Sequence, residues 1–456
     1  MTRTRRDALY LLLIGTALFL ILSVSFEKSS PAAMQDFRVL YNPARCLIQG
    51  CDPYNEREVL RITHAEGRDR LSDTAVVRQI ATRYIYPPTS FSFTVPFAML
   101  PWGLAHIAWM SLTVGSLIFA SLLIWDLGAN NAPILSGAMV GLLLVNCELI
   151  VISGNSAGIV VSLCAIAVWC FFQDRFVPAG ILCLVVSLAI KPHDGGMVWL
   201  FLLLAGGVYR KRAIQTVVAF IVLSLPGLLW VWHVSPHWFH EMQSNIRAFS
   251  VHGGLTDPGP AAAAANGPGM LTNLQAVFSV YKDDPGFYNP ATYLVCAPLL
   301  LIWLYVTLRS RLSPAVVRLG LASIAALSLL PIYHREYDAK LLLLTVPACA
   351  MLWDEGGLVG WAALSLNFTA FVLTGDMPQA VLVGLLYHPD SPANGPYARA
   401  SAAGLAFPAP VILLIIGIFY LWVYFRRSVS DPASPSTHDR ISSPHIRVPA
   451  CPRIRV

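Results

Sequence analysis

The chain of 456 residues is 56% hydrophobic and only 12% charged, about half the charged fraction of an ordinary soluble domain. This balance excludes a soluble globular protein and predicts an integral membrane protein. The formal net charge of +6 does not indicate a nucleic-acid partner, because most basic residues lie in short segments between apolar runs, where they set membrane orientation.

The first apolar run covers residues 9–24 and follows three arginines, Arg3, Arg5 and Arg6. A cleaved signal peptide has the same pattern, and residues 29–33 offer a weak cleavage site. The run is close to the length needed to cross a bilayer. We therefore expect an uncleaved first membrane span.

A polar segment, about residues 25–87, follows this run and carries charges of both signs. We expect a structured loop outside the membrane, with helices along the interface. Asp36 lies within a few residues of the bilayer exit, where a carboxylate is costly unless a partner or a reaction uses it. Taken alone, Asp36 could equally pair with Arg38 or cap a short helix that begins at Phe37.

Eight of the nine cysteines fall into two groups. Cys46 and Cys51 lie in the first loop, where a disulfide would form in an oxidising compartment, but we expect two partly buried thiols. Six others lie inside apolar runs without metal-binding spacing and are expected to be small buried apolar residues. They are Cys147, Cys164, Cys170, Cys183, Cys296 and Cys349.

Beyond the loop, a stretch of about a dozen apolar residues lies between proline breaks at Pro88 and Pro101, which suits a re-entrant or interfacial helix. Longer apolar runs follow, and with the first span they predict about twelve crossings. The runs cover residues 104–125, 134–152, 156–172, 177–190, 195–208, 213–232, 291–308, 315–332, 339–353, 358–373 and 409–425.

Basic residues indicate the orientation of these spans. With the N-terminus inside, alternate short loops carry arginine and lysine, which is the positive-inside pattern. These residues are Arg175, Arg210, Lys211, Arg212, Arg309, Arg311, Arg318, Arg426 and Arg427. Four polar segments then lie together on the extracytoplasmic side of the membrane: the first loop, residues 191–194, the long loop 233–290 and residues 333–338. The tail, residues 428–456, is rich in Ser and Pro, and we expect it to be disordered in the cytoplasm.

This one-sided polar chemistry predicts a functional site. Lys191 lies on the side that the orientation rule disfavours for a basic residue, and a lone ammonium there suits a phosphate at headgroup depth. Lys340 is instead expected to reach from an apolar run toward water. His233, His237 and His240 have a helical metal-binding spacing, but Pro236 interrupts it and neighbouring aromatic residues favour a membrane-interface belt.

Several motifs in order resemble glycosyltransferase family 87, whose members transfer mannose from polyprenyl-phosphate mannose and have the multi-spanning GT-C fold. The motifs cover mainly the first two hundred residues, with a looser similarity at residues 333–338. One departure is Gly154-Asn155-Ser156-Ala157, where the family commonly has Gly-Gln followed closely by Asn. The matching residues are Asp36-Phe37, Tyr41, Ala44, Gly50, Pro53-Tyr54, Tyr84, Tyr86-Pro87-Pro88, Pro96, Pro101 and Lys191-Pro192.

The resemblance implies an all-α membrane protein of the GT-C type over residues 1–427. It implies a hexosyltransferase in the cell membrane that moves mannose or another hexose from a polyprenyl-phosphate donor to a lipid-linked or cell-envelope acceptor by inverting displacement. Asp36 would be the general base on the extracytoplasmic face. Lys191, His334 and Arg335 would bind the donor phosphate, and the substrate-binding residues would be Tyr41, Tyr54, Tyr86, Asn155 and Tyr337.

Glu336 and Asp338 could hold a divalent ion, but the first loop has no DxD motif, and we expect no metal and no cofactor. The alternative function is a multi-spanning transporter or lipid flippase, which would place its binding residues near the midplane of two related halves. A scaffold without chemistry would leave the one-sided polar cluster unexplained. The sequence specifies neither the sugar nor the acceptor.

Overall fold

The computed structural model describes residues 3–30, 33–65, 82–259, 271–310, 313–378, 381 and 407–430. These residues form helices and connections without a strand, apart from one isolated bridge between Leu271 and Arg335. The helices are α1 (Arg3–Ser29), α2 (Gln35–Ile48), α3 (Glu56–Ala65), η1 (Pro88–Ser90), α5 (Phe91–Ala98), α6 (Trp102–Ala129), α7 (Pro133–Val145), α8 (Glu148–Ser153), α9 (Ala157–Phe172), α10 (Val177–Ile190), α11 (Pro192–Ala205), α12 (Gly207–Val234), α13 (Trp238–Ser250), α15 (Leu274–Ser279), α16 (Pro285–Arg309), α17 (Pro314–Leu327), η2 (Asp338–Thr345), α18 (Val346–Glu355), α19 (Gly357–Leu373) and α22 (Pro408–Ser430).

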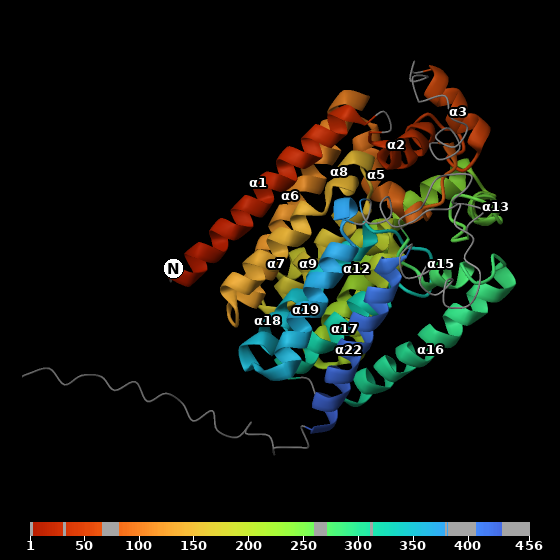
Figure 1. Ribbon diagram of the computed structural model, residues 1–456. Coiled ribbons are helices and arrows are strands. Elements are labelled where there is room, and N and C mark those ends of the chain that lie inside the picture. The colour runs from red at the N-terminus through yellow and green to blue at the C-terminus, as the bar shows by residue number, and fades with distance from the viewer. Residues whose placement is uncertain are drawn as a thin grey trace, which may run out of the picture.

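Most of these helices run roughly alongside one another in a bundle (Figure 1). Five helices, α1, α6, α12, α16 and α22, are long and apolar enough to cross a membrane. Five shorter apolar helices, α7, α9, α10, α17 and α19, pack with them. The chain is therefore an all-helical, multi-pass membrane protein, while the expected number of about twelve crossings remains a prediction.

Several inner helices are too short to cross the hydrocarbon core. Helices α10, α11 and α17 have 14 residues each, or about 21 Å at 1.5 Å per residue, against a core of about 30 Å. The long helices α6 and α12 have 28 residues, or about 42 Å. The long helices therefore exceed the thickness of the core, whereas the short helices fall short of it.

Helices α10 and α11 form an antiparallel hairpin with Lys191 at its apex. Arg212, in the first turns of α12, bonds to the carbonyl of Phe171 and to Asp174, just before α10. The indole of Trp199 in α11 donates to the carbonyl of Ala213 at 3.0 Å. The start of α10 and the end of α11 thus lie together at the end of the bundle opposite to Lys191.

Two predicted runs differ from the structure. Residues 134–152 form two helices, because the chain breaks after α7 and the carboxylate of Asp376 accepts a hydrogen bond (2.8 Å) from the backbone N–H of Leu149 in the first turn of α8. Residues 339–353 begin as the 3-10 helix η2 before α18. Helix α16 begins at Pro285, so the long loop is shorter than predicted and holds α13 and α15.

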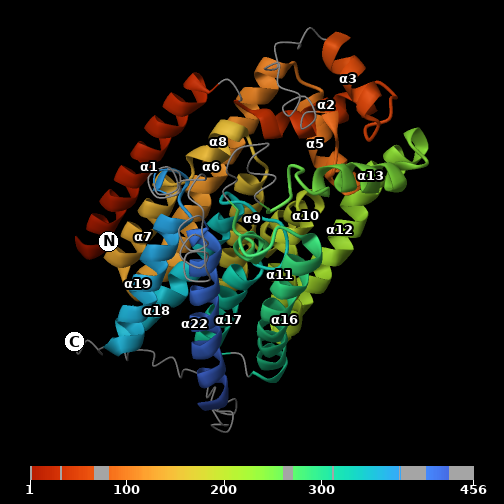
Figure 2. The same ribbon diagram turned by 45° about the vertical axis from the view of Figure 1, so that its right-hand side comes forward.

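The first loop is structured where it is described, and its residues 66–81 lie outside the described chain. Helices α2, α3, α5 and α13 gather at one end of the bundle (Figures 1 and 2). The Asn245 side chain of α13 bonds to the carbonyls of Tyr54 (3.0 Å) and Tyr84 (3.1 Å). The expectation of free thiols is wrong, because Cys46 and Cys51 are joined in a disulfide that closes the turn after α2.

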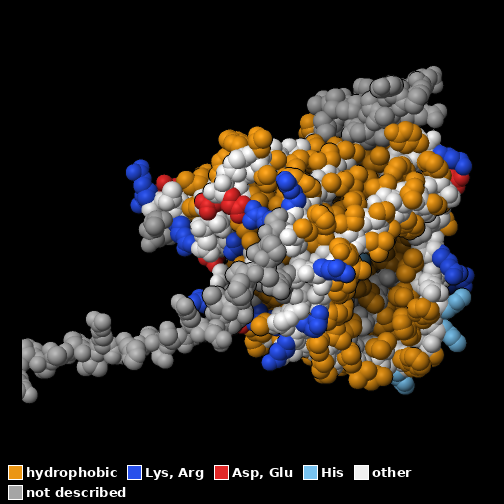
Figure 3. All heavy atoms as spheres, turned by 90° about the horizontal axis from the view of Figure 1, so that it is seen from below, with side chains coloured by type: hydrophobic (Ala, Val, Ile, Leu, Met, Phe, Trp, Pro, Cys, Tyr) orange, Lys and Arg blue, Asp and Glu red, His pale blue; other side chains and the backbone are white. Residues whose placement is uncertain are grey.

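The opposite end of the bundle carries exposed basic residues, among them Arg210, Lys211, Arg309 and Arg426. Figure 3 views this end and shows Lys and Arg side chains scattered among apolar ones. Residues 428–430 of the predicted tail are helical and belong to α22, whereas residues 431–456 lie outside the described chain.

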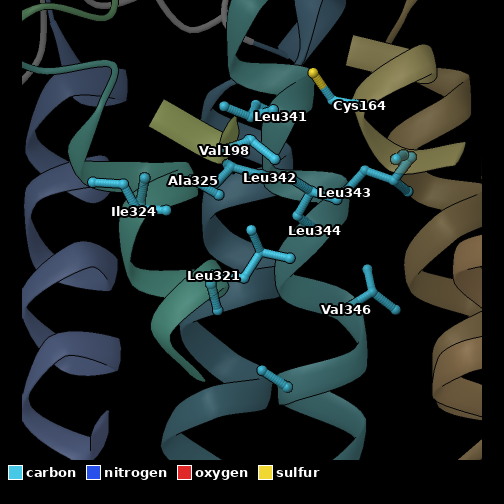
Figure 4. Packing of buried hydrophobic residues seen from close by; sticks show 14 of the residues in the cluster. Cys164, Val198, Leu321, Ile324, Ala325, Leu341, Leu342, Leu343, Leu344 and Val346 are labelled. Carbon is cyan, nitrogen blue, oxygen red and sulfur yellow. The ribbon is translucent and has the colours of Figure 1, made fainter. Parts of the chain in front are cut away.

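The apolar core lies where the short helices meet. Figure 4 shows Leu341, Leu342, Leu343 and Leu344 of η2 packed among side chains of α9, α11 and α17. All four are buried, and close packing of such side chains holds the helices together within a membrane. Since η2 directly follows residues 333–337, this core fixes the base of the polar segment that the sequence predicted to be functional.

Candidate active site

Asp36 lies in the first turn of α2. The partial positive charge of a helix N-terminus favours a carboxylate there. The neighbouring Phe37 ring stacks on Trp109 with ring centroids 4.6 Å apart, which anchors α2 to α6. The Asp36 carboxylate accepts a hydrogen bond of 2.7 Å from the side-chain amide of Asn155.

The position of Asn155 depends on the turn between α8 and α9. Gly154 has φ +66°, and a Cβ there would lie 2.9 Å from the Met34 sulfur and 3.0 Å from Phe37, so only glycine permits this approach of α2. Its carbonyl accepts a hydrogen bond from the indole of Trp109 at 2.9 Å. The Asn155 side-chain oxygen accepts from the backbone of Ala157 at 2.8 Å, which leaves its amide nitrogen directed at Asp36.

The three loop tyrosines predicted to bind substrate have different surroundings. The Tyr86 hydroxyl lies 3.4 Å from the hydroxyl of Ser156, next to Asn155. The Tyr54 hydroxyl donates a hydrogen bond to the backbone carbonyl of Tyr86 (2.7 Å) and so fixes the backbone there. Tyr41 is buried against Trp102 and donates to the carbonyl of Leu100 (2.7 Å). The structure thus places Tyr86 beside Asn155, while a substrate contact by Tyr41 or Tyr54 remains a prediction.

Lys191, at the apex of the α10–α11 hairpin, is almost completely buried. Its ammonium pairs with the carboxylate of Asp338 at the start of η2 and lies 3.3 Å from Asp194 in α11. It also lies 5.0 Å from the centre of the Tyr337 ring. The predicted phosphate-binding lysine is therefore held between two acidic residues that sequence reasoning had not assigned to it.

His334 and Arg335 join the same cluster from the connection between α17 and η2. The Nε2 atom of His334 lies 3.4 Å from Asp194, and its Nδ1 atom lies 3.1 Å from the carbonyl oxygen of Ile332. The backbone N–H of Arg335 donates to Asp338 at 3.0 Å. Its guanidinium donates to the hydroxyl of Tyr333 at 2.6 Å and, among the described residues, lies within ion-pair distance of no carboxylate.

Electrostatic effects connect the two parts of the site. Burial raises the pKa of Tyr86 to about 12, the charge of Lys191 lowers it, and the charges of Asp36 and Asp338 raise it further. Burial lowers the pKa of His334, but the carboxylates of Asp194 and Asp338 outweigh burial and raise the pKa overall. Asp36 and the Lys191–Asp338 pair therefore both act on the pKa of the Tyr86 hydroxyl.

A second buried ion pair lies close to this cluster. Lys340 is buried and bonds to Asp376 (2.7 Å) and to the carbonyl of Thr374 (2.9 Å), so the expectation that it reaches toward water is wrong. Glu148 is also buried, and neither of its carboxylate oxygens has a hydrogen-bond partner among the described residues. A charged residue within a predicted apolar run was the only sequence signal for either group.

The arrangement combines a carboxylate held by Asn155 with a separate cluster of cations around Lys191. A carboxylate can accept a proton from a hydroxyl group, and cations can stabilise a leaving phosphate. Of the nine predicted site residues, seven lie in this arrangement, and Tyr41 and Tyr54 lie beside it. Asp194 and His193 join it as residues whose roles the sequence did not indicate, and Asp338, which the sequence suggested only as a possible ligand of a divalent ion, joins it as the partner of Lys191.

Comparison with known proteins gives one family match. The model of glycosyltransferase family 87 matches residues 84–331, a range that includes Tyr86, Asn155 and Lys191, whereas Asp36, His334 and Arg335 lie outside it. Neither the curated proteins nor the solved structures contain a significant match. Because the family match covers more than half of the chain, the protein belongs to glycosyltransferase family 87 and is a membrane glycosyltransferase.

Proposed function

We propose that this protein transfers a hexose, mannose or a related sugar, from a polyprenyl-phosphate donor to a lipid-linked or cell-envelope acceptor at the extracytoplasmic face. The observation that carries the proposal is the hydrogen bond between Asp36 and Asn155 together with the cluster that holds Lys191, His334 and Arg335. A donor whose phosphate lies at these cations and whose anomeric carbon lies toward Asp36 matches this arrangement of charges.

In the proposed reaction Asp36 acts as general base. Its carboxylate accepts the proton of the acceptor hydroxyl while that oxygen attacks the anomeric carbon of the donor. The bond between the anomeric carbon and the phosphate oxygen breaks, and the phosphate leaves with the electron pair. One displacement inverts the anomeric configuration. The amide of Asn155 orients Asp36 through its hydrogen bond of 2.7 Å.

The cations stabilise the charge that develops on the leaving phosphate. Asp338 and Asp194 already pair with Lys191, so Lys191 orients the cluster and offers its remaining donor to a phosphate oxygen. Arg335 has only the Tyr333 hydroxyl as a side-chain partner among the described residues, and its planar guanidinium suits a phosphate. We therefore assign the larger share of phosphate binding to Arg335.

Two features support the extracytoplasmic location. The exposed basic residues Arg210, Lys211, Arg309 and Arg426 lie at the opposite end of the bundle, as the positive-inside rule expects for the cytoplasmic end. The Cys46–Cys51 disulfide lies on the same side as Asp36, and disulfides persist in oxidising compartments.

The test is a release assay with purified protein in detergent. Polyprenyl-phosphate sugars are supplied one by one together with a membrane lipid extract as acceptor, without any ion gradient. We expect release of polyprenyl phosphate and a glycosylated lipid product with one of these donors. A protein that moves intact donor across vesicle membranes but never releases polyprenyl phosphate would be a flippase, and the proposal would be wrong.

A further inference from the structure

Two histidines and a buried aspartate converge beside Lys191. One side-chain atom of each of His193, Asp194 and His334 lies within 4.8 Å of the other two. His193 and Asp194 open helix α11, and His334 comes from the connection between α17 and η2, more than one hundred residues away. The fold, and not local sequence, brings them together.

In the two buried members of this trio, the atoms that face each other make no hydrogen bond among the described residues, although the Lys191 ammonium lies 3.3 Å from one oxygen of Asp194. Asp194 is 1% exposed and His334 is fully buried. Neither oxygen of Asp194 and not the Nε2 atom of His334 has a hydrogen-bond partner among the described residues. A buried polar group without a partner costs about 1–3 kcal/mol, and more when it is charged. Such a cost in two adjacent side chains indicates that a ligand binds between them.

The tautomer of His334 also indicates that a ligand binds between His334 and Asp194. Its Nδ1 atom lies 3.1 Å from the Ile332 carbonyl oxygen, which can only accept a hydrogen bond, so Nδ1 carries the proton. The Nε2 atom faces the Asp194 carboxylate, 3.4 Å away. A lone pair at Nε2 would oppose the carboxylate, so a cation lies between them, either a second proton on the ring or a metal ion. A histidine that donates its second N–H to a carbonyl is the usual arrangement of a metal ligand.

The spacing favours a metal ion over a proton. A charge-assisted N–H···O bond is about 2.7–2.9 Å long, whereas Nε2 of His334 and Nε2 of His193 lie 3.4 and 3.6 Å from the same oxygen of Asp194. Tetrahedral zinc with bonds of about 2.05 Å sets its ligand atoms about 3.3 Å apart. Octahedral geometry with similar bonds would set adjacent ligands about 3.0 Å apart.

We propose that His193, Asp194 and His334 form a binding site for a tetrahedral divalent transition metal, zinc being the ion that best fits two imidazoles and one carboxylate. Lys191, 3.3 Å from the second oxygen of Asp194, balances the charge of that oxygen. The His193 side chain is 36% exposed, so it can turn to bring its Nε2 atom within bonding distance of the ion. This site departs from the metal-independent chemistry expected from the sequence.

The fourth position of such an ion would be open to an outside ligand. The carboxylates of Asp194 and Asp338 exceed the charge of Lys191 by one while both imidazoles are neutral. A bound dication turns this deficit into one excess positive charge, which suits a phosphate oxygen as fourth ligand. This last step rests on the proposed donor-phosphate site, whereas metal binding itself does not.

The first test measures metal binding without any substrate. Full-length protein is purified without a polyhistidine tag, stripped with a chelator and dialysed against zinc, and the bound metal is measured by mass spectrometry. We expect one zinc per chain and at least about tenfold weaker binding in His193→Asn, Asp194→Asn and His334→Asn. His240→Asn, which replaces an exposed histidine of α13, serves as the control and should keep its zinc.

Two results would overturn the metal site: wild-type protein that binds no zinc, or zinc binding equal in all three variants and the control. The wild-type measurement decides even where a variant fails to fold, and the visible absorption of the cobalt-loaded protein reports tetrahedral geometry independently. Release of polyprenyl phosphate by a protein that binds no zinc would refute the proposed metal site and support the proposed function. Bound zinc whose removal changes nothing in that assay would retain the metal site and remove its contact with phosphate.

Discussion

Removing the charge of Lys191 separates its structural role from its role toward phosphate. The Lys191 and Asp338 side chains are only 6% and 3% exposed, and loss of one partner of such a buried pair costs about 3–5 kcal/mol of stability. Lys191→Ala should therefore lower the thermal stability of the protein in detergent. The double variant Lys191→Ala/Asp338→Asn should recover part of that loss, because it no longer leaves Asp338 unpaired.

The same substitution should weaken binding of the leaving group. A hydrogen bond to a charged group contributes about 1.5–3 kcal/mol, which corresponds to roughly ten- to a hundred-fold in affinity. Product inhibition by polyprenyl phosphate should weaken by that factor in Lys191→Ala, and Asp338→Asn, which removes a negative charge from the cluster, should not weaken it. Lys191→Arg should retain part of the binding, because the charge is kept and the geometry is not.

The assay is inhibition of sugar transfer by polyprenyl phosphate, measured on protein that elutes as a single folded species. Lys211→Ala, which removes an exposed basic residue at the other end of the bundle, is the matched control and should behave as wild type. Unchanged inhibition in folded Lys191→Ala would refute the reasoning and move the phosphate site to Arg335 alone.

Three further predictions follow from individual contacts. Asn155→Ala removes the amide that orients Asp36 and should lower kcat by about tenfold or more with little change in donor KM, and an equal loss of folded protein would show that Asn155 is only structural. Burial and the neighbouring Asp52 raise the pKa of Glu241 to about 7. The protonated form is therefore favoured in the folded state, and the stability of the protein should fall as pH rises from about 4.5 to 7. Glu241→Gln should flatten this dependence of the thermal unfolding temperature on pH, and an unchanged dependence would contradict the assignment. A cysteine replacing Arg57 in α3 should react with a membrane-impermeant thiol reagent on intact cells and one replacing Lys211 should not, and the reverse result would invert the topology.

Local features of the sequence predicted most of the helices. The run 177–190 coincides with α10, and the run 104–125 lies within α6, because proline, glycine and charged residues limit these apolar stretches. The position of each helix relative to the bilayer could not be predicted from its sequence. A run of 14 apolar residues does not reveal whether the helix crosses the bilayer or ends inside the bundle, since that depends on the longer helices packed around it.

The site was predicted residue by residue where charge alone identified it. Lys191, His334 and Arg335 were singled out because charged groups at the ends of apolar runs are costly without a partner. The partners themselves were not visible. Asp338 is 147 residues from Lys191, and Asp376 is 36 residues from Lys340. Only the fold determines these pairings, and the disulfide between Cys46 and Cys51 likewise depends on the turn after α2.

The most direct test of the account is transfer by Asp36→Asn. With a polyprenyl-phosphate sugar that wild-type protein uses, the variant should bind the donor with near-normal affinity, remain folded and lose turnover by about two to four orders of magnitude, as expected for a missing general base. The asparagine keeps the size of the side chain and its contact with Asn155 while losing the ability to accept a proton. Turnover equal to wild type in Asp36→Asn would contradict the account.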